Sequence, residues 1–436
     1  MTAPTGATAT SGTSGTAARR ASAWDGYRQI LADPAHRGFS AAGLLARMPV
    51  SMTGLGVVLL VSLTTGSFGR AGLVAGVLTL TGALAAPWWG RLIDRIGQAP
   101  VLLAAAAMNL TGLAGVIAGV LTEAPLALIC LAAALAGLGF SSAGSCVRAR
   151  WAHRLSNPAQ LNSAYALEGV LDEVVFMVGP VLATFVATTV HPAAALITAA
   201  LVGTTGAVAL AAQRRSEPPI RGRRQPGAVR ARLPLALLIS VTVAAGALGA
   251  LFGGMEVVVV AYAKESGILA YAGLILMVWA GGSLLAGLVT GAVAWRASPV
   301  RRFRVGAVAL ALSMVPLVFV DQPLAVAGLL VLSGLAIAPT LIASVAVVQS
   351  SVPRTRLTEA LGWTTMGVAA GVAAGAAGLG RVIDEYGAGA GFLGVAGVGA
   401  LLIAAALAVP SARPATAQPG TPAAAPPPIE AGSRPR

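Results

Sequence analysis

Apolar stretches about as long as a membrane is thick recur along almost the whole chain, and they constrain the fold more than any other feature. A helix needs about 20 such residues to cross a bilayer core roughly 30 Å thick. Only helices and closed barrels satisfy their backbone groups in lipid, and a barrel would show short alternating segments. Charged residues make up only 10% of the chain, too few to cover a water-facing surface. The sequence therefore predicts an all-α integral membrane protein.

Twelve membrane spans are predicted, in two groups of six. The first group covers about residues 41–64, 71–90, 99–121, 125–147, 164–188 and 192–212. The second covers about residues 234–262, 269–294, 305–320, 323–349, 358–380 and 389–409. We expect an N-terminal six-helix bundle at 41–212, an arginine-rich cytoplasmic linker at 213–232 and a C-terminal six-helix bundle at 233–410. Residues 1–40 are predicted to be a largely disordered N-terminal segment, and residues 411–436 a disordered tail rich in proline and alanine.

Basic residues fall mainly on one side of these twelve spans. The termini and the even-numbered loops hold 25 of the 29 lysines and arginines, whereas the odd-numbered loops hold three. Because basic residues concentrate in cytoplasmic loops, we expect a multi-pass protein of a bacterial plasma membrane with both termini in the cytoplasm. The net charge of +14 lies in short loops rather than along one face, so we expect no nucleic-acid partner.

The two halves show a weak internal repeat. Sliding the sequence by 201 positions aligns Gly66 with Gly267 and Arg95 with Arg296. Two six-helix halves related by an axis along the membrane normal are a recurrent transporter plan. The repeat favours two pseudo-symmetric bundles in a protein that we expect to be a monomer.

The segment after the second span reads GRLIDRIGQAP. It contains Gly90, Asp94, Arg95 and Gly97. This stretch resembles the signature loop between helices 2 and 3 of the major facilitator superfamily, although Gln98 and Ala99 stand where the family has basic residues. The resemblance implies that family's fold, alternating access, and a gating loop that meets the start of helix 11 in the outward-facing state. The alternative is that Asp94 and Arg95 form a simple salt bridge within the loop.

The fifth span holds three of the chain's 15 acidic residues. Glu168 and Asp172 share a helix face, whereas Glu173 points about 100° away from Asp172. An ionised group near the bilayer centre costs on the order of 2.5–3.5 kcal/mol, so these carboxylates need a partner, a proton or water. Arg47 lies at a similar depth in the first span, and the resemblance places helices 1 and 5 in one bundle. We expect Arg47 to pair with Asp172 or Glu168.

Proton coupling is the hypothesis for this acidic run, because a carboxylate that moves between an apolar environment and an arginine can bind and release a proton. The alternative is that these acids only lock helices together or lie at the headgroup level. Glu256, near the outer end of the seventh span, is a further candidate to bind a proton or a cationic group at the outer vestibule. Its alternative is simple exposure to water.

Gly179 and Pro180 lie deep in the fifth span, where proline removes a backbone hydrogen bond and bends the helix. The pair resembles the helix-5 antiporter motif of proton-driven exporters in the same superfamily, although Val175, Ala183 and Thr184 depart from that motif. The residues expected to line the transport pathway are Ser141, Ser142, Trp279, Pro339, Thr340 and Trp363. Trp151 and Trp295, at span ends, are expected to be interfacial anchors.

The sequence favours a secondary transporter that works by alternating access and exports an amphipathic or hydrophobic small molecule in exchange for protons. Proton-symport uptake of a small metabolite is the alternative, and a non-transporting membrane sensor or scaffold stays open. No nucleophile, histidine or multi-aspartate motif suggests an enzyme, and no phosphate-binding loop suggests an ATPase. Cys130 and Cys146 make no metal pattern. We expect no metal and no cofactor, with a proton gradient as the energy source and the lipid bilayer, protons and a small molecule as partners.

Overall fold

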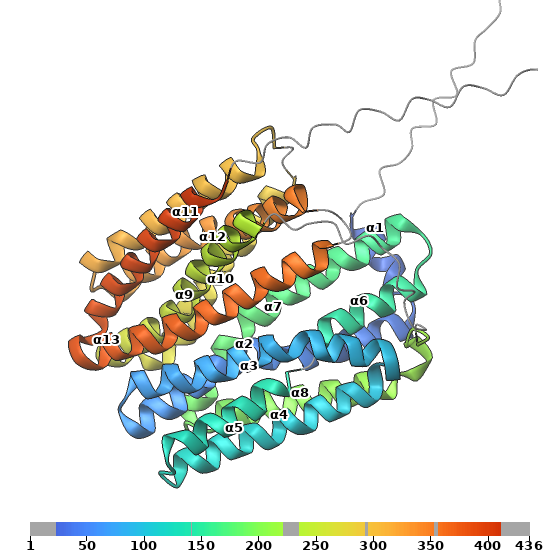
Figure 1. The fold of residues 1–436 in the computed structure, drawn as a ribbon. Coiled ribbons are helices and arrows are strands. Elements are labelled where there is room, and N and C mark those ends of the chain that lie inside the picture. The colour runs from blue at the N-terminus through green and yellow to red at the C-terminus, as the bar shows by residue number, and fades with distance from the viewer. Residues whose placement is uncertain (1–22, 141, 221–234, 293–294, 353–355, 411–436) are drawn as a thin grey trace, which may run out of the picture.

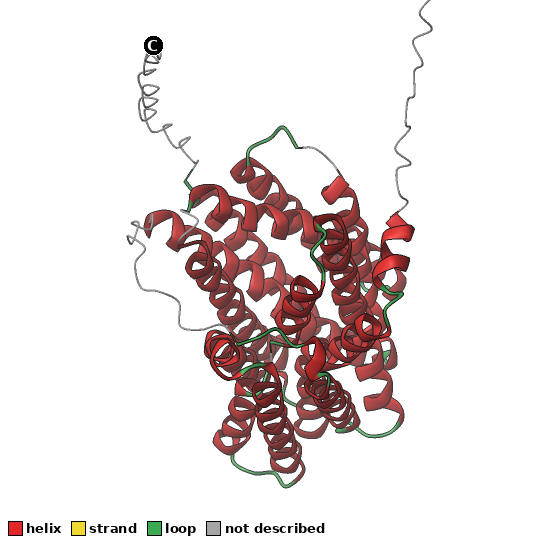
Figure 2. Ribbon diagram, turned by 90° about the vertical axis from the view of Figure 1, so that its right-hand side faces the viewer, coloured by secondary structure: helices red, strands yellow, loops and turns green. Residues whose placement is uncertain are grey.

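The structure is a computed structural model that describes residues 23–140, 142–220, 235–292, 295–352 and 356–410. Within these ranges every regular element is helical (Figure 2), which confirms the predicted all-α class. The predictions for Ser141, for most of the linker, for the tail and for the first 22 residues fall outside the described residues.

Eight α-helices and a short 3₁₀ helix make up the described part of the first half of the chain. They are α1 (Ala23–Ile30), α2 (Pro34–Thr65), α3 (Phe68–Ile96), α4 (Gln98–Leu121), α5 (Leu126–Leu138), α6 (Ala143–Arg154), α7 (Pro158–Thr189), α8 (Ala194–Ala212) and η1 (Arg214–Ser216). The second half follows the same pattern. Its described elements are α9 (Leu235–Glu265), η2 (Leu269–Tyr271), α10 (Ala272–Ala292), α11 (Pro299–Met314), η3 (Val315–Phe319), α12 (Pro323–Ser351) and α13 (Leu357–Ala408).

Three of the helices begin at a residue whose side chain caps the helix and which is followed by proline. Asp33, Asn157 and Ser298 are the N-caps of α2, α7 and α11, and each side chain accepts a hydrogen bond from a backbone amide of its helix. The proline that follows supplies a φ angle suited to the first turn and lacks only an N–H that would have no partner there. These local signals start α2 and α11 about six residues earlier than the hydrophobic pattern predicted.

The fourth span is broken, whereas the sequence predicted one continuous span over 125–147. Helix α5 ends at Leu138, α6 begins at Ala143, and the intervening Gly139 lies directly against the backbone of α4 at Asn109. Only a glycine permits this approach, because a Cβ there would collide with the amide nitrogen of Asn109. The break sets α6 apart as a short helix of its own.

The last two predicted spans are joined in α13, which runs through 52 residues. A straight helix of that length would reach about 78 Å, more than twice the thickness of a bilayer core. Gly387 interrupts it with a φ of 81° and a ψ of 178°, which turns the chain back. The described residues contain eleven long apolar helical segments when α5 and α6 are taken together as one, and these therefore provide twelve crossings.

The crossings form two bundles, α2 to α8 and α9 to α13 (Figure 1). Helix α1 and the C-terminal end of α13 lie on the same side of the molecule, which we call the terminal face. The other side, which carries Gly66 and Gly387, is the opposite face. The bundles approach one another toward the opposite face and diverge toward the terminal face (Figure 1).

Two helix pairs join the bundles near the opposite face. Helix α3 packs on α13 so closely that a Cβ on Gly72 would collide with the carbonyl of Ala376. Helix α10 packs on α7 in the same manner, with Gly273 against the carbonyl of Pro180. Small residues at such crossings permit backbone contact between membrane helices.

A side chain of the second bundle also caps a helix of the first at this face. The carboxylate of Asp384, in α13, accepts hydrogen bonds from the backbone amides of Phe68 and Gly69 at 2.6 and 2.9 Å. It accepts a third from the Ser67 hydroxyl at 2.7 Å. An acid at a helix N-terminus stabilises the unpaired amides and the helix dipole, so Asp384 links α13 to the start of α3 at the opposite face.

The terminal-face halves of α3 and α13 show no comparable contact in the described residues. A Cβ added to Gly90 of α3 or to Gly362 of α13 would meet nothing within 4 Å. Trp88 and Trp363, on the same two helix halves, are 72% and 48% exposed. The bundles are therefore closed at the opposite face and separated at the terminal face.

Candidate functional site

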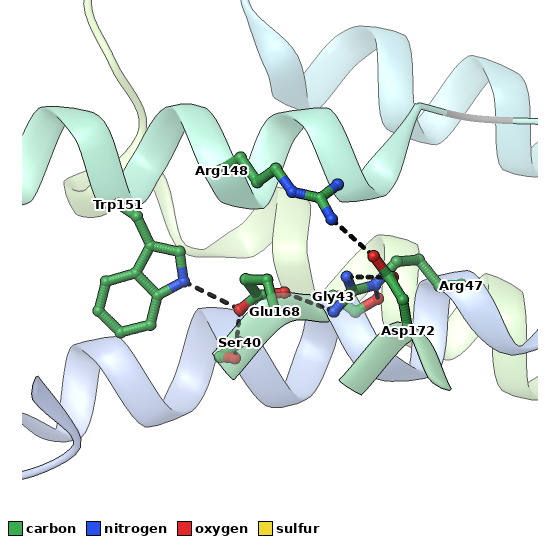
Figure 3. Close-up of polar contacts among 7 residues, drawn as sticks. All are labelled: Ser40, Gly43, Arg47, Arg148, Trp151, Glu168 and Asp172. Carbon is green, nitrogen blue, oxygen red and sulfur yellow. Dashed lines mark hydrogen bonds and ion pairs between the residues drawn. The ribbon is translucent and has the colours of Figure 1, made fainter. Parts of the chain in front are cut away.

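Glu168 of α7 lies at the centre of a polar network inside the first bundle (Figure 3). Its side chain is fully buried. One carboxylate oxygen accepts hydrogen bonds from the Ser40 hydroxyl at 2.7 Å and the Trp151 indole N–H at 2.9 Å. The other accepts from Nη2 of Arg47 at 2.6 Å. Helices α2 and α6 thus supply every donor to this carboxylate.

Asp172 lies one turn further along α7 and connects two arginines (Figure 3). Nη1 of Arg47 donates to one carboxylate oxygen at 2.7 Å, and Nη2 of Arg148 donates to the other at 2.6 Å. The Asp172 side chain is 34% exposed and that of Arg148 is 42% exposed. Asp172 therefore joins the buried part of the network to solvent-accessible space.

Two glycines make room for the arginine that bridges these acids. A Cβ on Gly43 would collide with Val147, so α2 and α6 cross closely at that point. A Cβ on Gly144 would lie 3.3 Å from Cδ of Arg47. Arg47 is further fixed by its Nε, which donates to the carbonyl of Gly43 at 3.0 Å. The guanidinium is held in the fork geometry that suits two carboxylates.

The network balances two formal positive charges against two negative ones. Burial is costly for each charge, and that cost is offset only when every donor and acceptor has a partner. Removal of one member would leave an uncompensated charge, which typically costs about 3–5 kcal/mol at a fully buried pair. A loss of charge at Asp172 would remove the ion-pair partner of Arg148, whereas Arg47 would keep its ion pair with Glu168.

The pairing of Arg47 with both Glu168 and Asp172 was expected from the sequence, and the structure contains it. The sequence reasoning missed Ser40, Arg148 and Trp151. Trp151 was predicted to be an interfacial anchor, and this is wrong, because its side chain is fully buried. Arg148 and Trp151 are three residues apart in α6, a spacing that places them on one helix face and could have revealed them.

Glu173 stands apart from the network. It is half-buried in α7, and within the described residues no hydrogen bond or ion pair involves its side chain. This fits the expectation that it points away from Asp172.

Glu256 lies between the bundles and deeper than the sequence suggested. It lies nine residues before the end of α9 at Glu265, about 14 Å at 1.5 Å per residue. Helix α9 extends three residues beyond the predicted span end, so the residue lies further from the helix end than the sequence predicted. A Cβ on Gly54 of α2 would lie 3.3 Å from its Oε1. Within the described residues its half-buried carboxylate has no hydrogen-bond or ion-pair partner.

The predicted gating loop is mostly helical, since α3 continues to Ile96 and includes Gly90, Asp94 and Arg95. Both charged side chains are exposed, and in the described residues no ion pair joins Asp94 to Arg95 and no hydrogen bond joins Asp94 to α13. Gly97 alone links α3 to α4, with a φ of 89° and a ψ of 171°. The gating role of this segment stays a prediction.

The start of α4 is capped by a residue that the sequence reasoning missed. The Glu217 carboxylate accepts hydrogen bonds from the backbone amides of Gln98 and Ala99. The fully buried guanidinium of Arg150 donates to the side chain of Gln98 at 2.8 Å and to that of Ser216 at 2.8 Å. Glu217 was overlooked because its segment was interpreted only by its arginines.

Gly179 and Pro180 lie where α7 meets two neighbours. A Cβ on Gly179 would collide with the side chain of Ser51 in α2, and the carbonyl of Pro180 faces Gly273 of α10. Ser51 also donates a hydrogen bond to the carbonyl of Val175 at 2.7 Å. The pair is therefore a packing point between α2, α7 and α10.

Several residues predicted to line the pathway are packed within the second bundle instead. Trp279 is 8% exposed and donates to the Ser333 hydroxyl at 2.8 Å. Thr340 is fully buried, and its hydroxyl bonds to its own helix at Ala336. Pro339 lines a surface pocket between α11 and α12. Ser142 is the half-buried N-cap of α6, and Trp363 is exposed near the terminal face.

The described residues contain no group of three or more histidine, cysteine, aspartate or glutamate side chains placed to hold a metal ion.

Comparison with solved structures shows the same fold in several transporters. The nucleoside transporter NupG matches with a TM-score of 0.66 at 13% identity, covering 86% of this chain and 99% of that one. A bacterial homologue of the iron transporter ferroportin, in an inward-facing state, gives 0.64 at 15% identity, with 85% and 98% covered. A bacterial homologue of the human lysosomal transporter Spinster, inward-facing and occupied, gives 0.63 at 13% identity, with 88% and 96% covered.

No curated protein matches the sequence. The family model of the Major Facilitator Superfamily matches residues 39–328, which is more than half of the chain. The matched region includes the whole network, Glu256 and the segment from Gly90 to Gly97. The chain belongs to the Major Facilitator Superfamily of membrane transporters.

Proposed function

We propose that this transporter exchanges protons for a small amphipathic cation or hydrophobic amine and exports it from the cytoplasm. Glu256 carries the proposal. An ionised carboxylate within the hydrocarbon thickness is costly unless something neutralises it, and Glu256, inside the membrane-spanning helix α9, has no hydrogen-bond or ion-pair partner in the described residues. A proton or a cationic cargo can neutralise it, but not both at once, and this competition is the basis of antiport.

The polar network of the first bundle supports a role for protons. Asp172 is half-exposed and shared between two arginines, so protonation would release Arg148 while Glu168 keeps Arg47 in place. Helix α6 would then be less firmly held against α7. A local change of charge would thereby alter the packing of two helices.

The arrangement of the bundles supports alternating access. With the terminal face assigned to the cytoplasm by its basic residues, the state described here is open inward and closed outward. An inward-open exporter would accept cargo from the cytoplasm at Glu256. The likeness of Gly179 and Pro180 to the antiporter motif favours export, and proton-symport uptake is the competing function.

The test is exchange in liposomes that contain the purified full-length protein and a trapped pH-sensitive dye. An outward gradient of tetraphenylphosphonium, a lipophilic cation, is expected to drive proton entry through the wild-type protein. Glu256→Gln is expected to abolish this exchange, because a neutral amide cannot alternate between proton and cation. Glu123→Gln, an exposed acid on the opposite face, is the matched control and should leave the exchange unchanged.

Asp172→Asn distinguishes the role of the polar network from that of the cargo site at Glu256. It should reduce the coupling of proton flux to the cation while leaving tetraphenylphosphonium binding within about twofold of wild type. Co-transport of probe and protons in the same direction would instead establish symport. Full exchange in Glu256→Gln would refute the proposed mechanism.

A further inference from the structure

A pocket of about 730 Å³ opens on the surface of the second bundle between α11 and α12. Its lining has two chemically distinct parts. The rim carries Arg296, Arg301, Arg302 and Trp295, all near the terminal face. The floor is formed by apolar side chains of α11 and α12, including Val305, Ala309, Leu332 and Leu335. The residues that line this pocket include neither the polar network around Glu168 nor Glu256.

The rim concentrates positive charge that the described residues do not neutralise. No ion pair involves Arg296, Arg301 or Arg302 within the described ranges. The guanidinium of Arg302 lies 4.7 Å from the centre of the Trp295 ring, a cation–π contact that orients it without a counter-charge. Nearby Arg304 differs, because its Nη2 donates to the carbonyl of Val409 at 2.6 Å.

The floor is exposed although it is apolar. Val305 and Leu332 are 62% and 60% exposed, and both belong to helices long and apolar enough to cross a membrane. Between Arg301 and Ala309 the groove follows α11 for about 12 Å. At its base α11 and α12 touch, since a Cβ on Gly306 would collide with the Thr340 hydroxyl. The surface therefore faces hydrocarbon, with its charged end at the membrane boundary.

We propose that this pocket binds one anionic phospholipid. The phosphate lies among the three arginines, whose planar forks donate paired hydrogen bonds to phosphate oxygens. An acyl chain lies along the groove between α11 and α12. A free anion would leave the apolar floor unused, and a zwitterionic lipid would leave net charge on the rim. Basic pockets between membrane helices on the cytoplasmic side suit anionic headgroups.

The test is lipid retention by the full-length protein, purified from vesicles of phosphatidylglycerol and phosphatidylcholine in equal amounts and then analysed by native mass spectrometry. The wild-type protein is expected to retain one phosphatidylglycerol. Arg296→Gln, Arg301→Gln and Arg302→Gln should each weaken retention roughly fivefold, the factor that corresponds to about 1 kcal/mol for one basic residue near an anionic surface. The triple variant should retain none.

A matched control removes the same charge elsewhere on the terminal face. The triple variant Arg28→Gln, Arg37→Gln and Arg215→Gln changes three exposed arginines and should retain phosphatidylglycerol like wild type. Ala309→Trp fills the groove, keeps the rim and should also abolish retention. Equal retention by the two triple variants would overturn the proposal. Displacement of the lipid by glycerol 3-phosphate at the same concentration would also overturn it and assign the rim to free anions.

Discussion

At the scale of single residues, the network shows how a chain with few polar groups distributes them. Glu168 is fully buried and has three donors, whereas Asp172, one turn away, remains partly exposed and has two. Two carboxylates on one helix face thus have different environments. The first is suited to hold α2, α6 and α7 together, and the second is suited to change its protonation.

Glu168→Gln should destabilise the protein more than Asp172→Asn. The buried position loses its charge opposite Arg47, and such a loss typically costs about 3–5 kcal/mol, whereas solvent screens the exposed position. The midpoint of thermal unfolding in detergent measures the stability of both variants, with Glu123→Gln as the neutral control. Equal decreases of the unfolding midpoint in Glu168→Gln and Asp172→Asn would contradict the different roles assigned to the two carboxylates.

Gly97→Ala should lower stability by about 1–3 kcal/mol, because its backbone angles belong to a region that only glycine adopts readily. The added methyl group would also lie 2.8 Å from Oε1 of Glu217. Gly389→Ala, in open space on α13, makes the same chemical change and is expected to have little effect. The comparison is again made by thermal unfolding, and a neutral Gly97→Ala would show that the α3–α4 link adapts without strain.

At the scale of elements, hydrophobic length predicted the number of crossings but not their breaks. The break at Gly139 and the late end of α3 depend on contacts with neighbouring helices, which hydropathy does not encode. For the same reason the sequence predicted only Arg47 among the partners of Glu168 and Asp172. Arg47 stood out as a charge within an apolar run, whereas Arg148 and Trp151 lay in a segment that the basic-loop pattern explained without them.

Helix α3 provides a test of the closed opposite face. Gly72→Ala would place a methyl group against the carbonyl of Ala376, so the two bundles could no longer close there. We expect faster labelling of a buried reporter, Ser62→Cys, by a membrane-impermeant maleimide in a background lacking Cys130 and Cys146. Gly328→Ala, which meets nothing within 4 Å, is the control. Unchanged labelling in Gly72→Ala would mean that this crossing does not hold the face shut.

Asp384→Asn tests the cap that α13 places on α3. An amide still accepts a hydrogen bond but lacks the charge that favours a helix N-terminus, a difference of about 0.3–1 kcal/mol. We expect the same maleimide to label Ser62→Cys roughly two- to fivefold faster. Slower labelling than in the parent protein would show that Asp384 opposes closure.

At the scale of the whole molecule, two bundles that touch near one face and separate near the other form a state from which alternation can begin. Span count, the internal repeat and the resemblance of the segment from Gly90 to Gly97 led to the two-bundle plan, and the distribution of basic residues led to the expected orientation. None of these could indicate which face is closed, because closure depends on a small difference in free energy between two arrangements of the same helices.

A disulfide across the closed face should stop transport reversibly. A Cβ on Gly69 would lie 3.5 Å from Cα of Arg381, so Gly69→Cys with Arg381→Cys is expected to cross-link on oxidation. Exchange of tetraphenylphosphonium should then cease and return with a reductant. Gly90→Cys with Gly362→Cys, at the separated face, should not cross-link in this state. Undiminished exchange by the cross-linked protein would exclude alternation between these faces.

Helix α7 runs without interruption from Pro158 to Thr189. It carries Asp172 and, eight residues later, Pro180, whose carbonyl packs against Gly273 of the other bundle. The distance along the helix between these points is about 12 Å. One helix therefore connects the charged network inside the first bundle to a contact with the second, which makes α7 the shortest covalent path between charge chemistry and the joint of the two bundles.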